Sequence, residues 1–262
     1  MLSLDLTGRT ALVGGSTQGI GLASAQALAS LGVSCVLISR NEEKLQAAVK
    51  TLSTPAGQQH QYLVADYTDP AQVEVVVAGF VKEHTIHILV NNSGGPAGGP
   101  VTKALPDEFI KAFSQHLICN HIITMLLTEG MKREGYGRII NIISTSVKIP
   151  LKDLGVSNTI RGAVASWAKT MANELGQFGI TVNNVLPGAT STERLATILN
   201  NKSAKTGKSR EEVEREMMEE VPARRFGKPD EIAALVAFLA SPAAAYINGT
   251  SIPVDGGRTG SI

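Results

Sequence analysis

The chain has 262 residues, 43% of them apolar and 18% charged, which excludes global disorder and allows a substantial buried core. The formal net charge of +1 gives no basic field for nucleic acid or a membrane surface, so we expect neither as a partner. Because the first residues lack a signal-peptide pattern and no apolar run reaches the ~20 residues that span a bilayer, the sequence predicts a soluble, cytoplasmic protein. Cys35 and Cys119 lie in apolar runs typical of small core residues, and no metal site is expected.

Short β-rich runs alternate with segments of helical period along the chain, a pattern typical of βαβ units and a parallel sheet. In chain order, the predicted strands cover residues 10–13, 33–39, 61–65, 86–90, 138–143, 180–185 and 252–254. The predicted helices cover 20–31, 42–52, a segment after Asp69-Pro70, 106–133, 156–175 and 231–239. The sequence therefore predicts one α/β domain over residues 1–262, with a Rossmann-type, doubly wound parallel sheet of about seven strands.

Residues 192–222 differ in composition from the rest of the chain, because they are polar and include a charged helix over 211–220 with little apolar face. A connection of this length is typical either of a mobile lid over a substrate or of a solvated surface excursion. We adopt the substrate lid for the description of the domain, and both interpretations stay open.

The first predicted strand leads through a glycine-rich turn, Gly14 to Gly21, directly into a helix. Glycines let the backbone approach a pyrophosphate closely, and a helix amino terminus presents unpaired N–H groups to an anion. The required strand before this turn and helix after it indicate a dinucleotide-binding site.

The spacing Gly15-x-x-x-Gly19-x-Gly21 resembles the short-chain dehydrogenase/reductase family, in particular its ketoacyl-reductase-like members. Further segments resemble that family in the same order along the chain, from about Leu4 to Gly257: Asp66, Asn91-Asn92-Ser93-Gly94, the strand from Gly137 to Ser144, the segment from Asn183 to Gly188, and Asp255-Gly256-Gly257. The family usually has Thr where Gly14 stands, so a hydroxyl that ties the turn together is missing, and we expect a looser cradle.

The resemblance implies a set of cofactor-binding residues, which are Gly15, Ser16, Thr17, Gln18, Gly19, Ile20, Gly21, Ser39, Arg40, Asp66, Tyr67, Asn92, Ser93, Gly94, Arg161, Pro187, Gly188, Thr190 and Thr192. At the end of the second strand, an acidic residue would accept hydrogen bonds from a ribose 2′-OH and repel a 2′-phosphate. Ser39 removes that repulsion, and Arg40 can pair with a phosphate. NADP(H) is therefore favoured, and NAD(H) stays possible.

Members of the family use a Tyr hydroxyl to move the proton, a Lys one helical turn later, a Ser before the Tyr and an Asn on the preceding long helix. Counting along the matched segments puts Ser144 at the serine position, Ser157 at the Tyr position, Arg161 at the Lys position and His116 at the Asn position. Asn120, one turn after His116, is the alternative. Three of the four side chains are thus substituted, and the usual proton donor is absent, because a serine hydroxyl is a far weaker acid than a phenol.

Three other residues could supply the proton. His116 titrates near neutrality in water, although a histidine on a half-buried helix is more often a satisfied core residue. Lys148 and Lys152 lie in the segment that lines the substrate mouth in relatives, although lysines in loops are more often plain solvated charges.

Two functions stay open at this point. One is an NADP(H)-dependent carbonyl reductase or alcohol dehydrogenase with altered acid catalysis, acting on a small molecule. The other is a cofactor-binding protein without turnover, such as a sensor, scaffold or assembly partner. The resemblance also implies a homo-oligomer, a tetramer or a dimer, to which the apolar stripe of the predicted helix 231–239 could contribute unless it faces the core.

Overall fold

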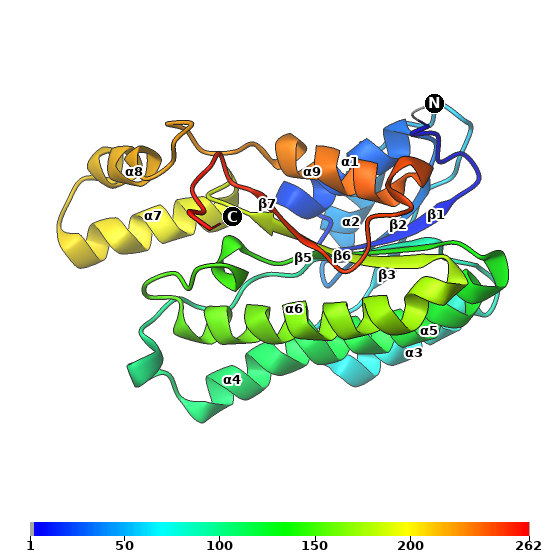
Figure 1. The fold of residues 1–262 in the computed structure, drawn as a ribbon, viewed down its shortest axis with the longest axis horizontal. Coiled ribbons are helices and arrows are strands. Elements are labelled where there is room, and N and C mark those ends of the chain that lie inside the picture. Colours follow the sequence, from blue (N-terminus) through cyan, green and yellow to red (C-terminus); the bar gives the residue numbers. More distant parts are fainter. Residues whose placement is uncertain (1–2, 262) are drawn as a thin grey trace.

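The computed structural model describes residues 3–261, and its centre is one seven-stranded parallel sheet in the order β3-β2-β1-β4-β5-β6-β7 (Figure 1). The strands are β1 (Thr10–Gly14), β2 (Ser34–Ser39), β3 (Gln61–Val64), β4 (Ile88–Asn91), β5 (Gly137–Ile142), β6 (Ile180–Pro187) and β7 (Ser251–Val254). The reversal of strand order next to β1 is the doubly wound arrangement, which confirms the predicted fold class.

Helices cover both faces of the sheet (Figure 1). On one face lie α1 (Gly19–Ser30), α2 (Glu42–Val49) and α9 (Pro229–Ala240), and on the other α3 (Pro70–Val81), α5 (Cys119–Glu134) and α6 (Gly155–Leu175). Successive strand residues point to opposite faces, so Val13 belongs to the first core and Leu12 to the second. Both faces are buried, which is why the middle residues of β1, β2 and β4 form continuous apolar runs.

The apolar stripe of α9 faces the core. Ile232, Val236 and Leu239 are all fully buried, and α9 packs against α1. Of the two interpretations that the sequence left open for this stripe, the structure supports packing within the chain.

A row of three amide side chains and one hydroxyl crosses four neighbouring strands. The Nδ2 group of Asn91 donates to Oδ1 of Asn141 (2.9 Å), Asn141 donates to Oδ1 of Asn184 (3.0 Å), and Asn184 donates to Oγ of Ser251 (3.0 Å). These residues are direct partners in the β4–β5, β5–β6 and β6–β7 registers. The buried amides are thereby paired with one another, and a one-residue slip of any strand would break the row.

The long helix predicted over 106–133 is interrupted. It consists of α4 (Pro106–Phe113), a π turn (Ser114–Ile118) and α5, so one extra residue enters the helical path at the π turn. His116 lies in this turn and is buried.

The segment predicted as a lid contains two helices, α7 (Glu193–Thr206) and α8 (Arg210–Glu219), which form the yellow and orange pair beside the sheet (Figure 1). The polar stretch that starts at Asn200 is the second half of α7, which the sequence analysis did not predict as a helix. The two helices share a small core, in which Leu195, Leu199 and Val213 pack with Phe226 from the segment after α8.

None of the helices within 3–261 is long and apolar enough to cross a membrane, and the same residues contain no cluster of three potential metal ligands. Cys35 and Cys119 are buried free thiols, as predicted.

Candidate functional site

The glycine-rich turn between β1 and α1 is shaped to receive an anion. Gly15 and Gly19 adopt left-handed backbone conformations, with φ of +53° and +57°. A Cβ on Gly21 would collide with the backbone oxygen of Gly15, so only glycine fits there. Gln18 is the N-cap of α1 but makes no capping hydrogen bond, and the first turn carries no acidic residue. The amino-terminal N–H groups of α1 are therefore open to a ligand phosphate, which fits a dinucleotide.

The cradle is also tied to the neighbouring strand, and its missing threonine has a replacement. Asn92 Nδ2 donates to the backbone oxygens of Gly14 (3.1 Å) and Gly15 (3.3 Å). A Cβ built on Gly14 would lie 2.5 Å from the backbone oxygen of Asn92 and 2.9 Å from the hydroxyl of Tyr67. The Tyr67 hydroxyl thus fills the space in which the family's threonine side chain would stand.

Beside the cradle, β2 ends at Ser39 and is followed by Arg40. The guanidinium of Arg40 lies 3.9 Å from the carboxylate of Asp66, and its side chain is 74% exposed. Such an exposed pair contributes little to stability, so Arg40 is free to turn towards a 2′-phosphate.

The residues that the sequence analysis placed at the catalytic positions lie on elements that meet at the carboxyl edge of the same sheet. Ser157 and Arg161 lie one turn apart on α6, and α6 packs against both the π turn that holds His116 and the 3-10 turn Thr145–Val147 that follows Ser144. Arg161 Nη1 donates to the backbone oxygen of Ile142 at the end of β5 (3.3 Å). Ser144 Oγ accepts a hydrogen bond from the Ser146 N–H group (3.1 Å).

His116 is held neutral by its surroundings. Its side chain is 1% exposed, Nδ1 lies 2.8 Å from the hydroxyl of Ser93, and Nε2 has no partner among the described residues. Burial first, and then the positive charges of Arg161 and Arg194, lower the pKa of His116 from 6.5 to about 3. Asn120, the alternative at this position, is also buried, one turn later on α5.

Arg194, in the first turn of α7, lies beside Arg161 and was not among the residues that the sequence analysis predicted for this site. Its Nη2 donates to the backbone oxygen of Pro96 (2.5 Å). The position above Gly95 that a Cβ would occupy is 3.6 Å from Arg194 Nη2 and 3.7 Å from Arg161 Nη2. Burial and the charge of Arg194 lower the pKa of Arg161 to about 10. One signal in the sequence could have identified Arg194. It lies two residues after Thr192, and the resemblance places Thr192 beside the nicotinamide. Lys148 and Lys152 are exposed.

The segment after β6 brings α7 over the cradle. Thr190 Oγ1 donates to the backbone oxygen of Gly188 (3.1 Å), and Thr192 caps α7 by accepting from Leu195 N–H (3.3 Å). A Cβ on Gly19 would lie 3.3 Å from a methyl group of Thr192. Gln18 Nε2 donates to the carboxylate of Glu193 (2.7 Å), so the beginning of α7 contacts the phosphate turn directly.

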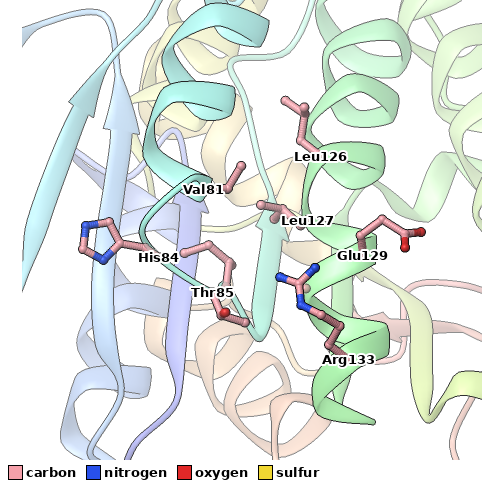
Figure 2. A pocket seen from close by; sticks show the side chains of 9 residues that line it. Val81, His84, Thr85, Leu126, Leu127, Glu129 and Arg133 are labelled. Carbon is pink, nitrogen blue, oxygen red and sulfur yellow. The ribbon is translucent and has the colours of Figure 1, made fainter.

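A second depression lies away from this site. It is a groove of about 120 Å³ between the end of α3 and α5, lined among others by His84, Thr85, Glu129 and Arg133 (Figure 2). Thr85 and Ile86 precede β4, so this groove is at the edge where the strands begin, whereas the phosphate cradle and the catalytic positions are at the edge where the strands end. It therefore takes no part in the site.

Comparison with known proteins agrees with this geometry. The family model described as enoyl-(acyl carrier protein) reductase matches residues 15–259. The chain is 32% identical to the 3-oxoacyl-[acyl-carrier-protein] reductase FabG of Vibrio cholerae, over 97% of this chain and 98% of that protein. It is similar to the L-sorbose reductase of Gluconobacter frateurii solved with NADPH and L-sorbose, with a TM-score of 0.93, 27% identity and full coverage of both chains. It is also similar to a variant of the actinorhodin polyketide ketoreductase solved with NADPH, with a TM-score of 0.90, 30% identity and full coverage of both chains.

Proposed function

Because the chain belongs to the short-chain dehydrogenase/reductase family, we propose that it is an NADP(H)-dependent oxidoreductase that acts on a carbonyl/alcohol pair with altered acid catalysis. The observation that carries this proposal is the meeting of an open phosphate cradle with Ser144, Ser157 and Arg161 at one edge of the sheet. Ligands bind at this edge, beyond the carboxyl ends of the strands, in doubly wound folds.

NADP(H) is the favoured cofactor. Two similar solved reductases contain NADPH. In this chain, Ser39 puts no carboxylate where a 2′-phosphate would lie, and the exposed Arg40 is within reach of that phosphate. NAD(H) would lose the contact with Arg40 and is expected to bind more weakly.

When bound, the cofactor supplies or accepts a hydride at the nicotinamide. The hydroxyls of Ser144 and Ser157 donate hydrogen bonds to the carbonyl oxygen of the substrate, and the positive charge of Arg161 stabilises the alkoxide that forms there on reduction. His116 is neutral at pH 7, because its pKa is about 3, so its imidazolium form does not act as the acid. Lys148 and Lys152 are exposed, so we assign proton delivery to water in the site. The hydroxide that this leaves is neutralised by exchange with the solvent, and this is the altered step.

The test is to follow NADPH absorbance with ketones, aldehydes and β-ketoacyl thioesters, after measuring NADPH binding by fluorescence. Loss of one positioned acid costs about 10²–10⁴ in rate, so we expect slow but substrate-dependent oxidation of NADPH. The double variant Ser157→Tyr/Arg161→Lys should raise the rate by at least about tenfold, because it restores the phenol and its ammonium partner.

The matched control is Ser166→Tyr/Thr170→Lys, an exposed pair at the same spacing on α6, which should leave the rate unchanged. No gain from the first double variant would contradict the assignment of proton delivery as the impaired step. Tight NADPH binding without any substrate-dependent oxidation would instead favour a cofactor-binding protein without turnover, a function that the named relatives, all reductases, do not support.

We also propose that the chain forms a homo-oligomer, a dimer or a tetramer. Ile110 and Phe113 on α4 and Met125 on α5 are large apolar residues that are 66%, 41% and 47% exposed. Large apolar side chains that are exposed in this way favour an interface. Sedimentation should give a mass above that of the monomer, and Ile110→Lys should lower that mass.

The cytoplasmic location stays a prediction.

A further inference from the structure

Two positively charged side chains share one small space beside the catalytic positions. Arg161 from α6 and Arg194 from α7 both bring Nη2 to within 3.7 Å of the same point above Gly95. Gly95 has no side chain, so that point is left open between the two guanidinium groups. The two arginines come from segments more than thirty residues apart in the sequence, and the folding of α7 over the edge of the sheet brings them together.

No carboxylate balances these charges. Among residues 3–261, neither guanidinium lies within 4.0 Å of an acidic side chain, although Asp153, Glu216, Glu220 and Glu231 all pair with other cations. Each guanidinium has five N–H donors. In the described part of the chain, Arg161 uses its donors on the oxygen of Ile142 and Arg194 on the oxygen of Pro96, so most of the donors stay available.

The partly desolvated surroundings of Arg161 and Arg194 raise the free-energy cost of leaving their charges without a counter-ion. The same region holds His116, which is 99% buried and whose Nε2 lacks a partner among residues 3–261. Two like charges and an unsatisfied ring nitrogen in one partly desolvated space destabilise the folded chain, and such arrangements are typical of a ligand site rather than of a structural one.

We propose that Arg161 and Arg194 form a binding site for a carboxylate group of the substrate, so that the carbonyl compound on which the protein acts is an acid. This inference rests on the proposed function. A carboxylate presents two coplanar oxygens that match the planar fork of a guanidinium, and it would neutralise both charges at once. Since Arg161 also lies one turn from Ser157, the carboxylate would hold the neighbouring carbonyl group at the serine hydroxyls.

The position of Arg194 adds a consequence for α7. Its guanidinium donates a hydrogen bond to the loop at Pro96, and it would bind the same carboxylate as Arg161 on α6. An acidic substrate would therefore link α7 to α6, whereas a neutral substrate of the same shape would not.

The test compares acids with their methyl esters. Pyruvate, acetoacetate and levulinate place a ketone at three distances from a carboxylate, and each methyl ester has the same ketone without the charge. We expect the wild-type protein to prefer at least one acid over its ester by about tenfold or more in kcat/KM, because hydrogen bonds to a charged group contribute about 1.5–3 kcal/mol. Arg194→Gln should remove that preference by raising KM for the acid, with the ester unaffected.

Two further variants make the result specific. Arg194→Lys keeps the charge but loses the planar fork, so its preference for the acid should fall between those of the wild type and Arg194→Gln. Arg210 is the first residue of α8 and lies beyond the carboxyl end of α7. Arg210→Gln also removes one positive charge, and it should leave the preference for the acid unchanged. Circular dichroism of each variant checks that it is folded.

Calorimetry separates this inference from the proposed function. Levulinate and its ester are titrated into the protein saturated with NADP⁺, where binding is read without turnover. Binding of levulinate that Arg194→Gln abolishes supports the carboxylate site even if no substrate is reduced. The inference is overturned if acids and esters bind and react equally in the wild type, or if Arg194→Gln weakens NADPH binding and affects acids and esters alike, which would assign the pair to the cofactor.

Discussion

Gly14 and Tyr67 form a complementary pair beneath the phosphate cradle. The sequence resemblance predicted a looser turn, because a threonine hydroxyl is missing at position 14, but the Tyr67 hydroxyl fills that space. Burial raises the pKa of Tyr67 well above its ordinary value, so the phenol stays protonated there. The glycine at position 14 is therefore explained by Tyr67, which lies more than fifty positions later in the sequence.

Restoring the threonine should consequently destabilise the protein. Gly14→Thr places a Cβ 2.5 Å from the Asn92 oxygen and 2.9 Å from the Tyr67 hydroxyl, and overpacking of this kind costs about 1–3 kcal/mol. Removing the hydroxyl relieves part of the clash, so Gly14→Thr/Tyr67→Phe should be more stable than the sum of its single variants by about 1 kcal/mol in denaturant unfolding. The matched pair Gly14→Thr/Tyr62→Phe should be additive, and additivity in both pairs would refute the complementarity.

The buried His116 should make stability depend on pH. Its folded pKa of about 3 lies below the ordinary 6.5, so between these values the unfolded chain binds a proton that the folded chain does not. The contribution of neutral His116 is present above pH 6.5 and is lost progressively as the pH falls towards 3, by about 2 kcal/mol between pH 7 and pH 4.5.

His116→Asn should reduce that loss, because the titrating ring is gone while all other groups remain. The measurement is the free energy of unfolding of both proteins at pH 7 and pH 4.5. An identical decrease in the two proteins would show that His116 is not responsible, and an NMR titration of the His116 ring in the wild type gives the folded pKa independently.

At the scale of elements, α7 and α8 should open separately from the sheet. Their apolar contacts are mainly with each other, through Leu199, Val213 and their neighbours, whereas the two main cores lie around the strands. Leu199→Ala removes a side chain that is 2% exposed, which should weaken this small core by about 2–4 kcal/mol. Hydrogen exchange should then accelerate in α7 and α8 while β1 and β5 stay protected.

Asn200→Ala, an exposed neighbour on the same helix, is the control and should change little. Acceleration throughout the sheet in Leu199→Ala would instead mean that α7 and α8 unfold together with the whole domain, and the predicted lid would then have no independent motion.

Sequence analysis predicted the helices well where buried apolar residues recur at helical spacing, and less well where most residues of a helix are exposed and polar. The stripe of α6 was identified because its buried residues recur at helical spacing. The second half of α7 was missed because residues from Asn200 onward are polar and mostly exposed, so no apolar period marks the helix. The π turn at His116 leaves no trace in composition, since an extra residue in a helix changes only the phase of the pattern.

At the scale of the whole molecule, the parallel sheet and the cofactor edge followed from the alternation of short strands with helices and from the glycine-rich turn after β1. The assignment of Ser144, Ser157 and Arg161 rests on counting between matched segments and stays a prediction; the structure shows that α6 packs against the turn after Ser144. Arg194 could not be placed in this way, because its approach to Arg161 depends on how α7 folds over the edge of the sheet.

The central claim is that this fold transfers a hydride without the usual phenol, and transfer of an isotopic label tests it most directly. The protein is incubated with the carbonyl panel and with NADPH that carries deuterium at both positions of C4, so that either hydrogen transfers the label, and the alcohol products are analysed by mass spectrometry. We expect deuterium on the carbinol carbon of at least one product. NADPH that binds tightly but delivers no deuterium to any carbonyl compound would contradict the claim.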